Sequence, residues 1–125
     1  MTDLADKSCA ACRAGVPPAT PAEIAAYLPQ LPGWRITEAE GIKRLEKSFS
    51  CKNFAAALAL TNRIAVIAEL ENHHPAIVTE WGRVTVSWWT HAIAGLHVND
   101  FIMAAKTDRA CAVPVAQAPS SSGTA

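Results

Sequence analysis

The fold is decided by residues 52–89, which read KNFAAALALTNRIAVIAELENHHPAIVTEWGRVTVSWW. No glycine or proline interrupts the first part of this stretch, and apolar residues recur there at helical spacing, so it predicts a long helix over about 52–72. This helix is apolar on more than one side, which predicts that other elements or a second copy of the chain cover it. The segments 76–79 and 83–89 are rich in β-forming residues and flank a turn glycine, Gly82, so they predict a hairpin.

A shorter helix is predicted upstream of this stretch. Thr20-Pro21-Ala22-Glu23 has the form of a capping box, with a hydroxyl cap, proline at the first helical position and glutamate at the third. We expect the helix to run from about Pro21 to Leu28. Pro29 and Pro32 should stop it, since proline lacks the backbone donor that a helix needs.

Two further elements complete the predicted fold. The segments 34–37 and 42–49 flank Glu38-Ala39-Glu40-Gly41 and indicate a first hairpin, although Arg44 falls outside the alternation of the second segment. A last helix is predicted over about 98–109. The order helix, hairpin, helix, hairpin, helix predicts an α+β fold, a four-stranded antiparallel sheet with three helices packed on one face.

The composition is typical of one globular domain. Half of the 125 residues are apolar and 18% are charged, which favours a packed core over disorder. The chain ends are poor in periodic apolar residues, so we expect a flexible tail over 1–19, a folded domain over 20–112 and a disordered tail over 113–125. A formal net charge of zero argues against nucleic acid as a partner.

No segment has the pattern of a signal peptide or of a membrane span. Residues 1–19 carry several charges, and the longest apolar stretches are broken by Arg63, Glu69 and Lys106. We therefore expect a cytoplasmic protein that does not contact the membrane. A reducing compartment predicts free thiols for the four cysteines, Cys9, Cys12, Cys51 and Cys111. The single pair Cys9 and Cys12 is interpreted as two exposed thiols, with a zinc bridge between copies as the alternative.

The histidines are the first functional signal, because all four lie within residues 73–97. His73 and His74 occupy the junction between the long helix and Pro75, where side chains can face a cleft. Glu69 precedes His73 by four residues, so a continued helix would let its carboxylate orient that imidazole. His73 and His74 are therefore candidates for proton transfer.

His91 is the third candidate. It follows the last predicted strand and is expected to be in phase with the polar face that carries Thr85 and Ser87. Any one histidine at the end of an element is more often a solvated or locally hydrogen-bonded residue than a catalytic one. A zinc site is a further alternative, but adjacent histidines direct their side chains apart and no tight acidic or cysteine complement lies nearby, so no metal is predicted.

A more specific signal is the segment Glu69-Leu70-Glu71-Asn72-His73-His74-Pro75, followed after five residues by Trp81, after nine more by His91 and after eight more by Asp100. This arrangement resembles the signature of the pterin-4a-carbinolamine dehydratase family. The likeness extends to Gly33-Trp34, to Thr90-His91 and to Asn99-Asp100-Phe101, and it spans about residues 20–109. The beginning, Cys9-Ala10-Ala11-Cys12-Arg13, is similar to that of bacterial members.

The resemblance implies that His73, His74 and His91 line a pterin pocket and share the acid/base catalysis. We expect His74 and His91 to be the principal pair, with His73 as an auxiliary or binding residue. Asp100 is expected to stabilise a helix N-terminus or to make a structural hydrogen bond that shapes the pocket. The other implied binding or supporting residues are Glu69, Asn72, Pro75, Trp34, Trp89, Thr90 and Ala92. Asn72 and Ala92 stand where some relatives have carboxylates, which puts the pH optimum and the substrate affinity in doubt.

The implied activity is that of a hydro-lyase, 4a-hydroxytetrahydropterin dehydratase, which yields quinonoid dihydropterin and water. An imidazole suits both proton transfers, since it ordinarily titrates near pH 6.5, and the pterin is the substrate, so no cofactor or metal is implied. Such an enzyme supports pterin recycling for an aromatic amino acid hydroxylase, as in phenylalanine hydroxylation, and relatives form homodimers or homotetramers. The alternatives are an assembly chaperone or transcription co-regulator on the same fold, and a metal-dependent hydrolase that uses the same histidines.

Overall fold

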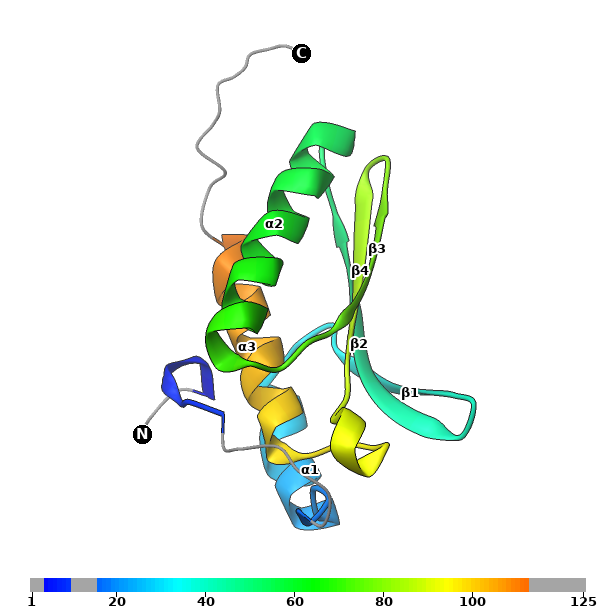
Figure 1. Cartoon of the computed structure of the whole chain (residues 1–125), viewed down its shortest axis with the longest axis vertical. Helices are drawn as coiled ribbons and strands as arrows, with labels where there is room; N and C mark the ends of the chain where they lie inside the picture. The colour runs from blue at the N-terminus through cyan, green and yellow to red at the C-terminus, as the bar shows by residue number, and fades with distance from the viewer. Residues whose placement is uncertain (1–3, 10–15, 113–125) are drawn as a thin grey trace.

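The computed structural model of the chain describes residues 4–9 and 16–112. Within these residues the helices and strands follow the predicted order (Figure 1). Their bounds are α1 Pro21–Tyr27, β1 Arg35–Ala39, β2 Ile42–Ser50, α2 Phe54–Glu71, β3 Ala76–Glu80, β4 Arg83–Trp88 and α3 Val98–Ala112. Three short 3-10 helices are η1 Leu4–Asp6, η2 Leu28–Gln30 and η3 His91–Ile93. The predicted α+β class is confirmed.

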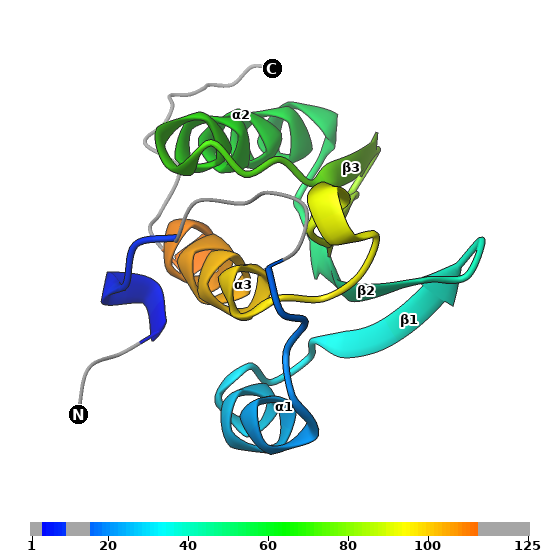
Figure 2. The same ribbon diagram turned by 60° about the horizontal axis from the view of Figure 1, so that its bottom comes forward.

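The four strands form one antiparallel sheet in the order β1-β2-β4-β3, so β2 and β4 join the two hairpins at its centre. The helices lie along one side of this sheet, and the tip of the β1–β2 hairpin extends away from them (Figure 2). Alternate side chains of a strand point to opposite faces. Those that face the helices are buried, namely Leu45, Phe49, Val84, Val86 and Trp88. On the opposite face the hydroxyls of Ser48 and Thr85 lie 3.0 Å apart.

Both hairpins are confirmed, and their turns follow from residues that tolerate a positive φ. Glu40 and Gly41 have φ values of 54° and 77°, which is the backbone of the two-residue turn that matches the twist of paired strands. Gly82 has a φ of 79° at the second turn. The strands of the first hairpin extend further into the turn than expected, because only two residues connect them.

Helix α1 begins as predicted and ends one residue earlier. The Thr20 hydroxyl accepts from the backbone N–H of Glu23 at 3.1 Å, and the Glu23 carboxylate accepts from the backbone N–H of Thr20 at 2.9 Å. As expected, α1 does not continue through Pro29; the chain goes on as the 3-10 helix η2, which accommodates Pro29 near its start, where its missing N–H is not needed. This 3-10 turn leads into Leu31, which is 2% exposed.

Helix α2 is bounded by two asparagines. The Asn53 side chain accepts from the backbone N–H of Ala56 at 2.8 Å, and Asn72 ends the helix in the left-handed conformation, with φ 51° and ψ 43°. The buried stripe of α2 consists of Ala57, Leu60, Ile64 and Ala68. Other apolar side chains of α2 are exposed in this single chain, namely Phe54, Leu58, Val66 and Leu70. The protein's own elements therefore cover only one side of a helix that is apolar on several.

The N-terminal segment Leu4–Cys9 is packed, which corrects the expectation of a flexible tail over residues 1–19. Leu4 is 3% exposed and belongs to the hydrophobic core. The Lys106 ammonium donates to the Ala5 carbonyl at 2.9 Å, and Asp6 pairs with Arg109 at 2.8 Å. An isolated leucine gives no periodicity, so this docking had no signal in the sequence.

Three of the four cysteines, Cys9, Cys51 and Cys111, lie among the described residues, and Cys51 and Cys111 are free thiols. Burial raises the pKa of both Cys51 and Cys111. Because the thiolate is the nucleophile, this burial makes both thiols less reactive than exposed cysteines near neutral pH. Cys12 lies outside the described residues, and so does the expected disordered tail over 113–125. Among the helices that are described, none has the length and apolar character needed to cross a membrane.

The left-handed residue Asn72 generates a prediction about stability. Replacing Asn72 by alanine should lower the free energy of unfolding by about 1 kcal/mol, because a Cβ without a compensating side-chain amide is disfavoured in this conformation. Glycine at the same position should leave stability nearly unchanged. Urea unfolding followed by tryptophan fluorescence measures both. Asn62→Ala, at an exposed position within α2, is the matched control and should not destabilise; equal losses at both positions would contradict the explanation.

Candidate active site

A buried histidine and a buried aspartate join the end of α2 to the start of α3. The His73 Nε2–H donates to Asp100 Oδ1 at 2.7 Å, and the two side chains are 4% and 0% exposed. The His73 ring also stacks on Trp88, with 5.7 Å between ring centres and 6° between ring planes. His73 is therefore part of the core, whereas its position at a junction had suggested a side chain that faces a cleft.

Asp100 is surrounded by donors. Its second oxygen, Oδ2, accepts from the Thr90 hydroxyl and from the backbone N–H of His97, each at 2.9 Å. It also lies in the first turn of α3, where the helix dipole favours a carboxylate. A buried carboxylate is tolerated only when its lone pairs are matched in this way. Asp100 thereby joins the start of its own helix to Thr90, ten residues earlier, and to His73, which is 27 residues earlier in the chain.

The left-handed turn at Asn72 decides which histidine faces solvent. It reverses the chain after α2, so that His73 points inward and the His74 side chain is 52% exposed. The Glu69 carboxylate accepts from His74 Nε2–H at 2.6 Å. The expectation that Glu69 would orient His73 is wrong, because the spacing of four residues places side chains on one face only while the helix continues, and α2 ends at Glu71.

His91 follows β4 and reaches the backbone of His74 from the other end of the β3–β4 hairpin. Its Nε2–H donates to the His74 carbonyl at 3.3 Å, and its ring stacks on Trp89 with 4.5 Å between centres. The expected alignment of His91 with the polar face of the last strand is wrong, because β4 ends at Trp88 and His91 begins η3. A bridge between Thr90 and Gly95 closes the loop that carries η3.

The two exposed imidazoles have equivalent ring atoms available for chemistry. A carboxylate and a carbonyl can only accept, so both His74 and His91 use Nε2–H as the donor to their protein partners. Within residues 4–9 and 16–112, neither Nδ1 atom has a hydrogen-bond partner. Each Nδ1 can therefore exchange a proton with a bound molecule. The arrangement provides two exposed imidazoles on residues that are in contact through the His74 carbonyl.

The other expected site residues divide into two groups. Most of them surround the histidines through neighbouring positions in the chain: Asn72, Pro75, Trp89, Thr90 and Ala92. Trp34 does not. Its Nε1–H donates to Asp108 at 3.0 Å, and Asp108 follows Asp100 by eight residues, about 12 Å along α3. The structure thus places Trp34 apart from the histidines of the same chain.

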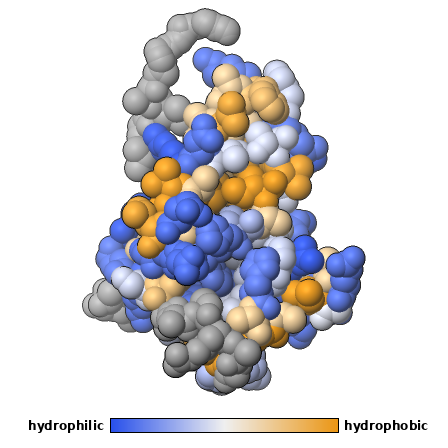
Figure 3. All heavy atoms as spheres, viewed as in Figure 1, coloured by the Kyte–Doolittle hydropathy of each residue, from blue (hydrophilic) through white to orange (hydrophobic). Residues whose placement is uncertain are grey.

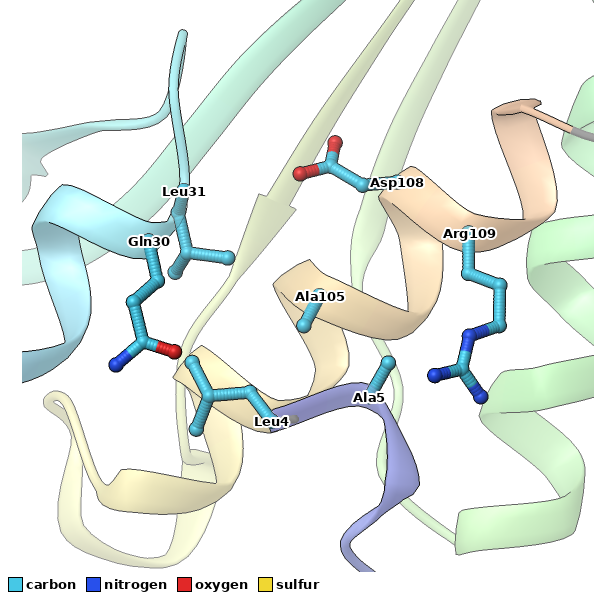
Figure 4. A pocket seen from close by; sticks show the side chains of 7 residues that line it. All are labelled: Leu4, Ala5, Gln30, Leu31, Ala105, Asp108 and Arg109. Atoms are coloured by element: carbon cyan, nitrogen blue, oxygen red, sulfur yellow. The ribbon is translucent and has the colours of Figure 1, made fainter. Parts of the chain in front are cut away.

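Two hollows of the described surface lie away from the histidines. One of about 370 Å³ opens where η1 crosses the C-terminal part of α3 (Figure 4), and its lining includes Leu4, Leu31 and Asp108. Another, of about 260 Å³, lies between α2 and α3 and is lined in part by Ile67, Leu70 and Lys106. The imidazoles of His74 and His91 stand at an exposed surface instead.

Sequence reasoning missed two residues of this region. Trp88 lies on the core face of β4, and its place in the alternation of that strand gives no indication that its ring stacks on His73. Arg44 lies over the Trp89 ring, with Cζ 4.1 Å from its centre. The only signal for Arg44 was its departure from the alternation of its strand. Among the described residues, no group of three or more His, Cys, Asp or Glu side chains is placed to hold a metal ion.

Comparisons with known proteins agree on one family. The family model for pterin 4 alpha carbinolamine dehydratase matches residues 17–110. Proteins provisionally named pterin-4-alpha-carbinolamine dehydratase are 55% identical in Syntrophotalea carbinolica, over 86% of this chain and 96% of the relative, and 58% identical in Gloeobacter violaceus, over 85% and 91%.

A solved structure gives the same answer. A transcriptional coactivator/pterin dehydratase from Brucella melitensis is 30% identical, with a TM-score of 0.67 over 75% of this chain and 98% of that one. A family model that covers most of the chain, relatives above half identity and a shared fold all coincide with the segment that carries the histidines. The chain belongs to the pterin 4 alpha carbinolamine dehydratase family.

Proposed function

We propose that this protein removes water from 4a-hydroxytetrahydropterin and releases quinonoid dihydropterin. In this elimination the bond between C4a and its hydroxyl oxygen breaks, the N5 proton is lost and a double bond forms between C4a and N5. One group must protonate the departing hydroxyl, and another must accept the proton from N5. Each well-placed proton transfer contributes about 10²- to 10⁴-fold to the rate.

The observation that carries this proposal is the pairing of His74 with His91. Their rings are exposed, their Nε2 atoms are held by Glu69 and by the His74 carbonyl, and both Nδ1 atoms are available. Two imidazoles in such an arrangement can serve one bound molecule as acid and base. His73 has a different part, since its Nε2–H is engaged by buried Asp100 and the ring is enclosed by the core.

The alternatives have less support. An assembly chaperone or a transcription co-regulator would not need exposed histidines held by acceptors. A metal-dependent hydrolase would need several ligands converging on one point, whereas the described donors pair with each other, His73 with Asp100 and His74 with Glu69. The proposed reaction needs no cofactor.

We extend the proposal to the setting of the enzyme. The reaction would recycle pterin for an aromatic amino acid hydroxylase in the cytoplasm. The chain would act as a homodimer or homotetramer, which is supported by the exposed apolar side chains of α2 and by Val78 on the edge strand β3. Hydrophobic residues gather over α2 and β3 on the face shown in Figure 3. A patch of this kind on a small protein marks an interaction surface.

The function is tested by following enzymatically generated 4a-hydroxytetrahydropterin by ultraviolet absorbance, with and without the purified protein, after treatment with EDTA. Faster decay that survives the chelator is the expected result. Decay at the unaided rate in the presence of folded protein would overturn the proposal. Activity that is lost to EDTA and restored by a divalent metal would support the hydrolase-like alternative instead.

The same assay separates the histidines. His74→Ala and His91→Ala should each lower the catalysed rate by about 10²-fold or more, because each removes one proton transfer. His73→Gln keeps an N–H donor for Asp100 and should retain most of the rate. The matched control is His97→Asn, since the His97 side chain only accepts from the backbone N–H of Asn99, a cap that asparagine can also form. A wild-type rate in His74→Ala would show that the pair is misassigned.

A stability measurement tests the role of Asp100. Asp100→Asn places an amide N–H₂ against donors that now meet a carboxylate, so we expect a loss of about 3–5 kcal/mol in the free energy of unfolding. Thr90→Val removes one neutral donor to the same carboxylate and should cost about 1–3 kcal/mol. Chemical denaturation of both variants gives the comparison. An Asp100→Asn loss no larger than that of Thr90→Val would mean that the pair with His73 contributes little.

A further inference from the structure

Arg44 is a cation held beside the histidines without a protein acceptor. It lies in β2 on the sheet face that points away from the helices, because its neighbour Leu45 points into the core. Its Cζ lies 4.1 Å from the centre of the Trp89 ring. Within residues 4–9 and 16–112 no carboxylate or carbonyl accepts a hydrogen bond from its guanidinium, and its Nε is buried without a partner.

The lack of a protein acceptor among the described residues distinguishes Arg44 from the other described arginines. Their guanidinium groups are engaged by protein acceptors: Arg35 by Glu46, Arg63 by the Ala110 carbonyl, Arg83 by Glu80 and Arg109 by Asp6. A guanidinium carries five N–H donors and no acceptor, and a partly buried donor that stays unpaired lowers stability. The cation–π contact with Trp89 orients Arg44 but leaves its donors unused.

Trp89 connects this cation to the proposed catalytic pair. The ring of His91 stacks on Trp89 with 4.5 Å between centres, and His91 contacts the His74 carbonyl through Nε2. The Arg44 Cζ and the His91 ring centre are thus no further apart than the sum of their two distances to the indole. A molecule bound at the imidazoles would lie within reach of the guanidinium.

We propose that Arg44 is a substrate-binding residue that donates hydrogen bonds to the C4 carbonyl of the pterin. The inference rests on the proposed dehydratase function. In the pterin ring the C4 carbonyl is bonded directly to C4a, the carbon that loses the hydroxyl, so a donor to this oxygen fixes the reacting carbon relative to His74 and His91. A guanidinium can only donate, and the carbonyl oxygen can only accept. Trp89 holds the guanidinium in place before substrate arrives.

Binding of two ligands that cannot lose water, measured without oxygen, tests the assignment. The ligands are tetrahydropterin, which keeps the C4 carbonyl and lacks the 4a hydroxyl, and the matched tetrahydropteridine without the C4 oxygen. Isothermal titration calorimetry compares the wild-type protein, Arg44→Met and Arg44→Lys. Arg83→Met is the control variant, because Arg83 lies on the same face of the sheet at the far end of β4 and pairs with Glu80 at 2.8 Å. Circular dichroism verifies that each variant is folded.

Arg44→Met should weaken tetrahydropterin binding by about ten- to a hundredfold, as expected for the loss of a charge-assisted hydrogen bond, and should change binding of the deoxo ligand by less than threefold. Arg44→Lys should recover part of the loss, because it keeps the charge without the planar fork. In the dehydration assay Arg44→Met should raise KM with little change in kcat. Arg83→Met should behave as wild type.

The outcomes distinguish this inference from the function on which it rests. Wild-type protein that neither binds tetrahydropterin nor accelerates dehydration would overturn the proposed function and the role of Arg44 with it. Wild-type activity together with unchanged tetrahydropterin binding in Arg44→Met would overturn the role of Arg44 alone. An equal loss for both ligands would also overturn it, because Arg44 would then act on a part of the ligand other than the C4 oxygen.

Discussion

The interaction on which the rest of this structure depends is the buried pair of His73 and Asp100. It ties the end of α2 to the start of α3, and through Thr90 it also holds the loop that follows β4. A carboxylate this deep in a protein is tolerated only because each oxygen is matched by a donor. With those contacts in place, the chain has little freedom in how it leaves α2, and the positions of the neighbouring residues follow.

The same pair explains how adjacent histidines come to differ in role. His73 lies in the core, where its ring stacks on Trp88. His74 is turned outward because Asn72 reverses the chain in the left-handed conformation. The backbone carbonyl of His74 is contacted by the ring of His91, which belongs to a separate segment. The packed interior thus holds two imidazoles at the surface, each oriented by a protein acceptor. In the proposed reaction this orientation would lower the cost of aligning the proton-transfer groups with the substrate.

The predictable part of the fold was encoded locally. The capping box at Thr20, the turn at Gly82 and the helical spacing of α2 are short-range patterns, and the elements they indicated are present. The predictions about Glu69 and His91 were wrong because the chain changes direction near each of them. Asn72 ends α2 before the spacing between Glu69 and His73 can apply, and the departure of the chain from β4 removes His91 from the strand's alternation. No periodic pattern contains such information.

Other features depended on contacts that are distant in sequence. The resemblance to a family indicated which histidines belong together. That Asp100 pairs with His73 and Glu69 with His74 follows only from the packed structure. The packing of Leu4 in the core could not be predicted either, because it depends on contacts with a distant part of the chain. This packing has a consequence for synthesis. Lys106 contacts the Ala5 carbonyl across 101 residues. The segment around Leu4 must therefore wait until α3, about 100 residues further along the chain, has been synthesised before this part of the interior can close.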